Sequence, residues 1–134
     1  MGVVMRGRST GRTTVELVHE SGATIKTTAP KDNGGDGSSF SPTDLFAASL
    51  GACASTIMSM FAADKHIPLE RVEFELVKEM SPPPRRVARI VVAFKLFGGL
   101  SDRDFDRVVG SGRACPVRLT LGEALEIDES YARG

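Results

Sequence analysis

The sequence predicts a single α+β domain, because segments with the two-residue period of strands occur in pairs and are followed by segments with the character of helices. The chain of 134 residues is long enough for one hydrophobic core and too short for two ordinary domains, so residues 1–134 are assigned to one domain. The expected order is two strands, a long helix, two strands, two shorter helices and a final strand.

The first two strands are predicted on either side of a tight turn at Glu20-Ser-Gly22. Val15 and Leu17 precede this turn, and the stretch 23–28, which contains several β-branched residues, follows it, as expected for a hairpin. The next segment, 30–39, is rich in glycine, aspartate and serine and has almost no apolar side chain. It is therefore predicted to be a surface loop.

A long helix is predicted to begin after Ser41, with Ser41 as the N-cap, Pro42 in the first turn and Asp44 at the positive end of the helix dipole. It should end near Asp64. Residues 45–63 carry no charge, so the helix must be covered on most of its sides. Serine, threonine and glycine make this segment only weakly apolar, and we expect a buried helix rather than a membrane span.

Small side chains recur every four residues along this helix and predict a smooth stripe on which a partner helix can lie close. They are Ala47, Gly51, Ser55 and Ser59. Two small sheets and two short helices offer too little surface to cover a helix that is apolar all round. We therefore expect the protein to be a homodimer.

The second half of the chain is predicted to hold two strands, two helices and a last strand. Apolar residues alternate with charged ones over 71–77 and recur at every second position over 85–97, so these stretches predict the strands, with three prolines between them. The helices should begin at Ser101 and at Cys115-Pro116 and end at glycines. Leu125 and the residues after it fit the final strand.

The charge balance argues against a nucleic-acid partner. Lysine and arginine together number 17, as do aspartate and glutamate, so there is no net positive field to attract a polyanion. The first residues contain no apolar stretch of the kind found in secretory signals. We therefore expect a cytoplasmic protein that binds neither nucleic acid nor a membrane.

The two cysteines are the candidate reactive groups. Cys53 lies in the middle of the uncharged helix, and Cys115 lies at the start of a later helix. In a cytoplasmic protein such residues are more often reduced thiols than a permanent disulfide, and a pair brought together by folding suits redox chemistry. From the residues alone, Cys115 is expected to be the more ionised thiol, because a helix start offers free amide groups and a positive dipole end. The alternative is that both cysteines only pack.

Neither a metal nor another cofactor is expected. The two cysteines and the two histidines, His19 and His66, are far apart in sequence and include no short-range pair of metal ligands. The glycine-rich loop 30–39 lacks the Gly-Lys-Ser/Thr ending of a phosphate-binding loop.

Two motifs carry a resemblance to a known family. The segment Phe40-Ser-Pro-Thr-Asp-Leu-Phe-Ala-Ala-Ser-Leu-Gly-Ala-Cys53 and the segment Ala114-Cys-Pro-Val117 resemble the OsmC/Ohr family, the osmotically inducible and organic-hydroperoxide-resistance proteins. The loop 28–35 shares the resemblance, which extends over nearly the whole chain. It implies an OsmC-like fold, in which antiparallel sheets wrap around central buried helices in an intertwined homodimer.

Active members of this family reduce organic hydroperoxides with a pair of cysteines. The resemblance implies that Cys53 attacks the peroxide and becomes a sulfenic acid, which then condenses with Cys115 to a disulfide. A dithiol reductant would reopen that disulfide by exchange. Phe40 and Phe46 are expected at the edge of an apolar pocket that favours alkyl or aryl peroxides over hydrogen peroxide.

The chain departs from the family pattern at the helix start. Peroxidases of the family have a glutamate directly after the proline, paired with an arginine from the early strands, whereas this chain has Thr43 at that position. Asp44 comes one residue later, a rotation of about 100° on a helix, and so it does not simply substitute for the glutamate. Thr43 and Asp44 remain candidate substrate contacts, and Arg12 is the candidate for the arginine.

Two classes of function follow. The first is a thiol-dependent peroxidase that reduces organic hydroperoxides. The second is a stress protein that binds a small hydrophobic ligand at the dimer interface, with the cysteines merely lining the site. The replacement of the family glutamate by Thr43 is compatible with this second function. General disulfide exchange with other proteins would require exposed thiols, which the apolar helix around Cys53 argues against.

Overall fold

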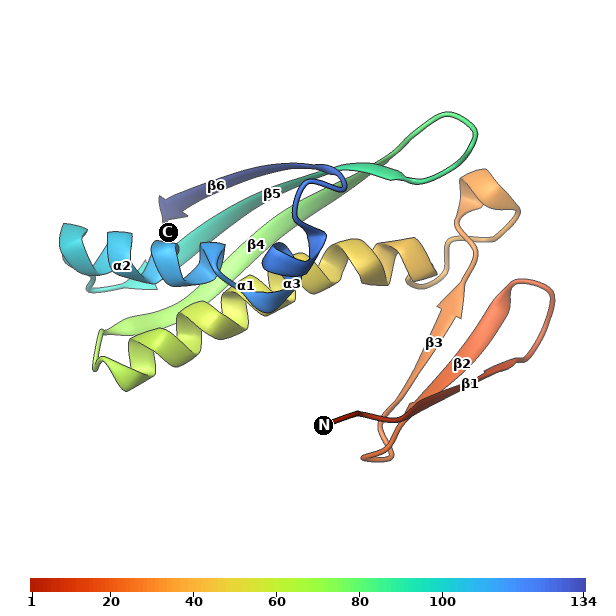
Figure 1. Cartoon of the computed structure of the whole chain (residues 1–134), viewed down its shortest axis with the longest axis horizontal. Coiled ribbons are helices and arrows are strands. Elements are labelled where there is room, and N and C mark those ends of the chain that lie inside the picture. Colours follow the sequence, from red (N-terminus) through yellow and green to blue (C-terminus); the bar gives the residue numbers. More distant parts are fainter. The chain divides into compact units, whose positions relative to one another are not determined.

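The computed structural model describes residues 1–134, which form two compact units, Met1–Phe46 and Ala47–Gly134 (Figure 1). Each unit contains its own three-stranded sheet. The long helix α1, Pro42–Asp64, begins in the first unit and continues in the second. The α+β class is confirmed, because the chain has two sheets and three α-helices.

The first unit contains an antiparallel sheet in the order β1-β2-β3, formed by Met5–Ser9, Thr14–His19 and Thr24–Thr28. The hairpin of β2 and β3 was predicted and is confirmed. Gly22 in its turn has a φ of 92°, a conformation that glycine adopts without steric cost. Strand β1 was not predicted, because its residues contain no β-branched side chain and show no apolar alternation.

The connection to α1 is a surface loop, as expected. It contains one short 3-10 helix, Lys31–Asn33, with no buried residue. The helix then begins with a reciprocal capping box. Ser41 Oγ accepts a hydrogen bond from the Asp44 amide at 3.0 Å, and the Asp44 carboxylate accepts one from the Ser41 amide at 2.9 Å. These bonds satisfy amide groups that the first turn would otherwise leave free, and they confirm Ser41 as the N-cap.

The second unit has a mixed sheet in the order β4-β5-β6, formed by Leu69–Met80, Val87–Gly98 and Glu126–Arg133. Strands β4 and β5 are antiparallel, but β5 and β6 are parallel. The expectation that every strand pair would be antiparallel is therefore wrong for the last pair. The physical reason is that two helices, α2 (Asp102–Arg113) and α3 (Pro116–Leu121), carry the chain back to the end of the sheet where β5 begins.

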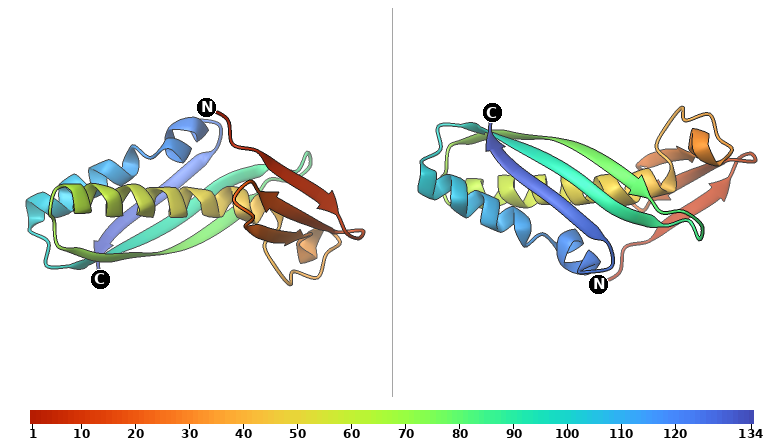
Figure 2. Two further views of the ribbon diagram at one scale, coloured as in Figure 1. Left: turned by 90° about the horizontal axis from the view of Figure 1, so that it is seen from below. Right: turned by 90° about the horizontal axis from the view of Figure 1, so that it is seen from above.

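The hydrophobic core lies between this sheet and its helices. Figure 2 shows α1, α2 and α3 on one face of the sheet. The inner face of β5 is apolar at every second residue, and each of these side chains is fully buried: Ile90, Val92, Phe94 and Leu96. They pack in one cluster with Leu50 and Met58 of α1 and Val108 of α2. Burial of apolar area of this kind is the main favourable contribution to folding.

Glycines permit two close approaches in this core. A side chain at Gly51 of α1 would collide with the ring of Phe74 on β4, and a Cβ at Gly112 of α2 would lie 2.8 Å from Met58 Cγ. The close contact between helices is therefore made at Gly112. The predicted stripe of small residues on α1 accommodates an aromatic ring from the sheet at Gly51.

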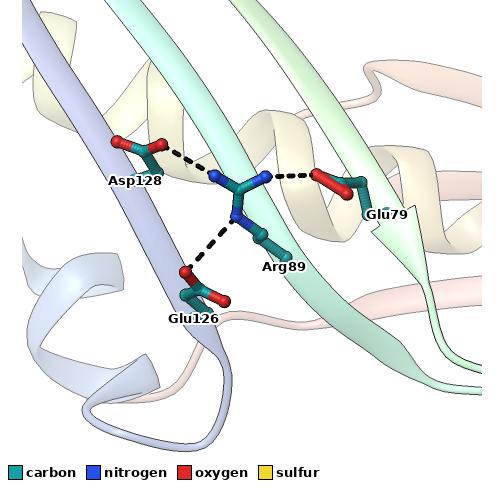
Figure 3. Close-up of polar contacts among 4 residues, drawn as sticks. All are labelled: Glu79, Arg89, Glu126 and Asp128. Carbon is teal, nitrogen blue, oxygen red and sulfur yellow. Dashed lines mark hydrogen bonds and ion pairs between the residues drawn. The ribbon is translucent and has the colours of Figure 1, made fainter.

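The outer face of the sheet carries an arginine that joins all three strands (Figure 3). Arg89 of β5 lies 2.8 Å from Glu79 of β4, and 2.8 and 3.4 Å from Asp128 and Glu126 of β6. The hydrogen bond that Arg89 donates to the Glu79 carboxylate is the main reason that the pKa of Arg89 is raised. Because these side chains are well exposed, the cluster contributes only modest stability, but it favours the observed register of β6 against β5.

The first unit has no hydrophobic core of its own. All core residues belong to the second unit, and the buried residues before Ala47 are Thr27, Thr28 and Ser41. Large apolar side chains of the first unit are exposed instead: Val3, Val4, Met5, Val18, Ile25, Phe40 and Phe46. A three-stranded sheet needs an apolar covering to be stable in water, so this unit exposes a surface that another element should cover.

Helix α1 is long and apolar enough to cross a membrane by length and composition, with a mean hydropathy of 1.6. The core helix of a soluble protein meets the same criteria. Here one face of the helix packs in the core, and the opposite face, including Ala52, Thr56 and Met60, is exposed and uncharged.

Gly98→Ala should lower the free energy of unfolding by about 2 to 3 kcal/mol. Gly98 has a φ of 141°, and an added Cβ would collide with the Pro68 carbonyl oxygen and lie 2.9 Å from the Glu70 amide nitrogen. Both obstacles are backbone atoms and cannot swing away. Gly99→Ala is the matched control, because nothing lies within 4 Å of its Cβ position. Equilibrium denaturation at one protein concentration should show a lower free energy of unfolding for Gly98→Ala only. An equal decrease in Gly99→Ala would contradict the steric argument.

Candidate active site: a pair of thiols

Cys53 is presented by the middle of α1. It is partly buried and packs against the hydrophobic core, while Ala52 beside it is exposed. The backbone amide of a mid-helix residue is already bonded within the helix, so the side chain is the reactive element at this position. Cys53 is a free thiol that is partly accessible from outside the chain.

Cys115 lies between α2 and α3 and is the N-cap of α3. Its Sγ accepts a hydrogen bond from the Arg118 amide at 3.4 Å, and Pro116 follows it at the first position of the helix. The Cys115 amide donates to the Gly112 carbonyl at 3.2 Å, which ties it to the end of α2. The predicted helix start is confirmed, and the side chain is fully buried, with 0% of its surface exposed.

The fold brings the two cysteines together. Helices α1 and α2 run in opposite directions (Figure 1). Gly112 packs directly on Met58. The chain that follows Gly112 therefore moves back along α1 toward lower residue numbers, and Cys115 becomes a neighbour of Cys53, close enough for Cys53 to shift the Cys115 pKa. Both thiols are free in the structure. Neighbouring free thiols, one partly exposed and the other buried, are suited to forming a reversible disulfide.

Burial raises the pKa of the Cys115 thiol above its ordinary value. The hydrogen bond from the Arg118 amide acts in the opposite direction but does not compensate, and the neighbouring Cys53 raises the pKa further. The expectation that the helix start lowers the pKa of Cys115 and makes it the more ionised thiol is therefore wrong. The helix start has the predicted geometry, but the removal of the sulfur from water has the larger effect.

Four further residues surround the connection that carries Cys115. Glu129 of β6 forms ion pairs with Arg113, at 3.6 Å, and with Arg118, at 3.4 Å. The guanidinium of Arg113 also lies 5.1 Å from the centre of the Tyr131 ring, which stacks on Phe94. The Tyr131 hydroxyl is buried without a hydrogen-bond partner, and burial raises its pKa to about 12. Sequence reasoning missed this cluster, although the two-residue period of β6 places Glu129 and Tyr131 on the face of Ile127.

The other predicted site residues belong to the first unit. Thr43 Oγ1 lies 3.2 Å from Ser41 Oγ, and the Asp44 carboxylate takes part in the capping box. Arg12 follows β1, and its guanidinium lies 3.8 Å from the position that a Cβ of Gly34 would occupy. Phe40 and Phe46 are exposed. Their contacts with substrate, and the role of Arg12 toward Cys53, stay predictions.

One open cleft of about 500 Å³ lies in the second unit, where α3 leads into β6. Its wall combines charged side chains, including Arg86, Arg118 and Glu126, with apolar ones such as Leu125. Neither cysteine lines it, so it is not the pocket predicted beside Phe40 and Phe46. No group of three or more histidine, cysteine, aspartate or glutamate residues in the chain could hold a metal ion.

The fold and the two cysteine motifs define a class of protein. The family model of the OsmC-like proteins matches residues 35–130. A protein of Psychrobacter arcticus, assigned provisionally to osmotic stress and detoxification responses, is 30% identical, with 100% of this chain and 98% of that chain covered and a TM-score of 0.86. This chain therefore belongs to the OsmC-like protein family.

More distant structures share the fold. An organic hydroperoxide resistance protein of Legionella pneumophila is 21% identical, with 98% of this chain and 97% of that chain covered and a TM-score of 0.73. An organic hydroperoxide resistance protein of Elizabethkingia anophelis is 13% identical, with 100% of this chain and 97% of that chain covered and a TM-score of 0.73. At these identities the likeness shows the fold alone. No curated protein sequence matches the chain.

Proposed function

We propose that the protein is a thiol-dependent peroxidase that reduces organic hydroperoxides. The observation that carries this proposal is the pair of free, neighbouring thiols, of which Cys53 is partly exposed and Cys115 is fully buried. A peroxide that enters from solution meets Cys53 first, and the thiol that must react second is already beside it. The names of the organic hydroperoxide resistance proteins with this fold agree with this chemistry.

The first half of the cycle consumes the peroxide. The Cys53 thiolate attacks the distal oxygen of ROOH, the O–O bond breaks, and the products are Cys53–SOH and RO⁻, which takes a proton and leaves as the alcohol. The Cys115 thiol then attacks the sulfenic sulfur. An S–S bond forms, the S–O bond breaks, and the thiol proton leaves with the hydroxyl group as water. Because burial raises the pKa of Cys115, its thiol stays protonated and can supply this proton.

The second half restores the thiols. A dithiol reductant attacks Cys53 of the disulfide and releases Cys115, and its second thiol then displaces Cys53, so the reductant leaves as a cyclic or bridged disulfide. Two protons and two electrons have passed from the dithiol to the hydroperoxide. This balance needs no metal or organic cofactor, and the reaction suits a cytoplasmic protein, where reduced thiols are available.

We also propose that the functional form is a homodimer. The first unit has exposed apolar residues and no core, and α1 has an exposed, uncharged face. A second copy of the chain is the partner that we propose for each of these surfaces. Activation of Cys53 is assigned to a cation at this interface, with Arg12 as the candidate that the family resemblance offers.

A second candidate function is the binding of a small hydrophobic ligand without peroxidase activity. The observation that favours it is the helix start, where Thr43 replaces the glutamate of the family peroxidases and the Asp44 carboxylate is bonded to the Ser41 amide. The exposed aromatic side chains of Phe40 and Phe46 would then contact the ligand.

Thiol counting with the reduced protein separates the two functions. One equivalent of cumene hydroperoxide should remove both thiols at least about a hundredfold faster than it oxidises free cysteine at the same pH, because the site holds the reacting groups in place. One equivalent of hydrogen peroxide should remove the thiols more slowly, because it has no apolar group that an apolar pocket could bind. Loss of thiols no faster than in free cysteine would reject the peroxidase and favour the binding protein.

A further inference from the structure

Both flanks of Cys115 are tied to one carboxylate. Arg113, two residues before the cysteine, places Nε 3.6 Å from Glu129 Oε1, and Arg118, three residues after it, places Nε 3.4 Å from Glu129 Oε2. The Arg118 amide also donates to Cys115 Sγ. The connection between α2 and α3 is thus fastened on each side of the thiol to the neighbouring strand β6.

This cluster differs from the ion pairs of the outer face. The side chain of Glu129 points toward the helices and is only 15% exposed, whereas Glu79, Glu126 and Asp128 around Arg89 are 47%, 69% and 55% exposed. A carboxylate that is shielded from water and salt attracts its partners more strongly than an exposed one, although the partners here, Arg113 and Arg118, are themselves 58% and 30% exposed. A shielded carboxylate with two guanidinium partners is therefore suited to restraining the backbone between them.

We propose that Glu129 is a positioning residue that holds Cys115 where its sulfur can reach Cys53. The inference rests on the proposed function and extends it, because it assigns the geometry of the second thiol to a residue on another element. Formation of a bond between two groups of one protein depends on the fraction of time in which they are aligned, and small misplacements slow such reactions strongly. Without Glu129 the connection would lose these two ion pairs to β6 and would be held by its own helix ends and by the packing of Cys115 and Val117 in the core.

The same residues allow an electrostatic role, which predicts the opposite result. Two guanidinium groups and one carboxylate leave a surplus positive charge near Cys115. Glu129→Gln would increase that surplus and favour the Cys115 thiolate, which is the attacking form in disulfide exchange. An electrostatic role therefore predicts faster closure of the disulfide in this variant, whereas a positioning role predicts slower closure.

Closure can be measured without peroxide, so the test does not depend on the peroxidase activity. Dithiobis(nitrobenzoate) reacts with Cys53 to form a mixed disulfide and releases one coloured nitrothiolate. Cys115 then attacks the Cys53 sulfur, the protein disulfide forms, and the second nitrothiolate leaves while the thiol proton passes to water. The rate of this second release reports how well Cys115 is positioned.

Glu129→Gln should slow the second release by about tenfold or more. Asp128→Asn is the matched control, because it removes the neighbouring carboxylate on the opposite face of the same strand and should change the rate by less than about twofold. An unchanged or faster release in Glu129→Gln, or equal slowing in both variants, would overturn the proposal.

A second variant tests the proposal if Glu129→Gln does not fold. Glu129→Asp keeps the charge but shortens the side chain, and it should slow closure of the disulfide severalfold. Closure at the wild-type rate in this variant would again overturn the proposal. Slow closure with no peroxidase activity would leave the positioning role intact and reject the proposed function.

Discussion

Cys53→Ser should abolish the rapid reaction with cumene hydroperoxide, whereas Cys115→Ser should react once and stop. Only Cys53 is exposed enough to meet the peroxide, so its loss removes the nucleophile and leaves Cys115 buried with a raised pKa. The expected rate of thiol loss in Cys53→Ser is no higher than that of free cysteine. In Cys115→Ser one equivalent of peroxide should produce one sulfenic acid, because no second thiol is present to condense with it.

Mass spectrometry after trapping with dimedone distinguishes the two outcomes. The adduct should form on Cys53 in Cys115→Ser and should be absent from the wild type, where condensation is faster than trapping. Dimedone labelling of Cys115 in Cys53→Ser would reverse the assigned roles. Rapid loss of thiols in both variants would show that the two cysteines act independently, and the disulfide cycle would then be wrong.

Met60→Lys should weaken the proposed dimer by about a hundredfold or more, because it would place an unpaired charge in an apolar interface, at a penalty of about 3 kcal/mol. Met60 lies on the uncharged, exposed face of α1 and is 58% exposed in the single chain. In a twofold dimer each copy contributes one such lysine, so a single penalty gives the hundredfold lower bound and the full two penalties would weaken the dimer by about 10⁴-fold.

Val77→Lys is the matched control for this prediction. Val77 is 51% exposed, but it lies on the outer face of the sheet, in register with Val91 of β5 and close in sequence to Glu75 and Glu79. A lysine there stays in water beside carboxylates and should leave the mass in solution unchanged. Sedimentation at several concentrations should show dissociation of Met60→Lys alone. A monomeric wild type, or a Met60→Lys variant that associates as the wild type does, would reject the dimer proposed through this face of α1.

Periodicity and capping signals predicted most of the fold because they act locally. The capping residues Ser41 and Ser101 mark the starts of two helices, and the apolar alternation from Ile90 to Leu96 marks the strand with the most buried side chains. Strand β1 was missed because all its residues are exposed, so no apolar pattern distinguishes it from a loop.

Features that depend on tertiary burial could not be predicted in the same way. The alternation in β6 is the same whether the strand pairs parallel or antiparallel, and the direction follows only from the crossover of α2 and α3. For Cys115 the helix start was visible in the sequence, but the desolvation that determines the direction of its pKa shift was not. The period of β6 places Glu129 on the inner face, but its ion pairs gave no sequence signal because the two arginine partners come from other elements.

The burial of Cys115 has a consequence for the order in which reagents react. In the proposed cycle the hydroperoxide and the dithiol both react at Cys53, the more accessible sulfur of the pair, and so they would react one after the other. The alcohol has to leave before the reductant can reach the disulfide, and a site in the disulfide state has no thiol with which to accept another peroxide. Such alternation produces ping-pong kinetics, with parallel lines in double-reciprocal plots at different dithiol concentrations. The proposed cycle would also protect Cys53, because prompt closure with Cys115 would leave little sulfenic acid for a second peroxide to oxidise irreversibly.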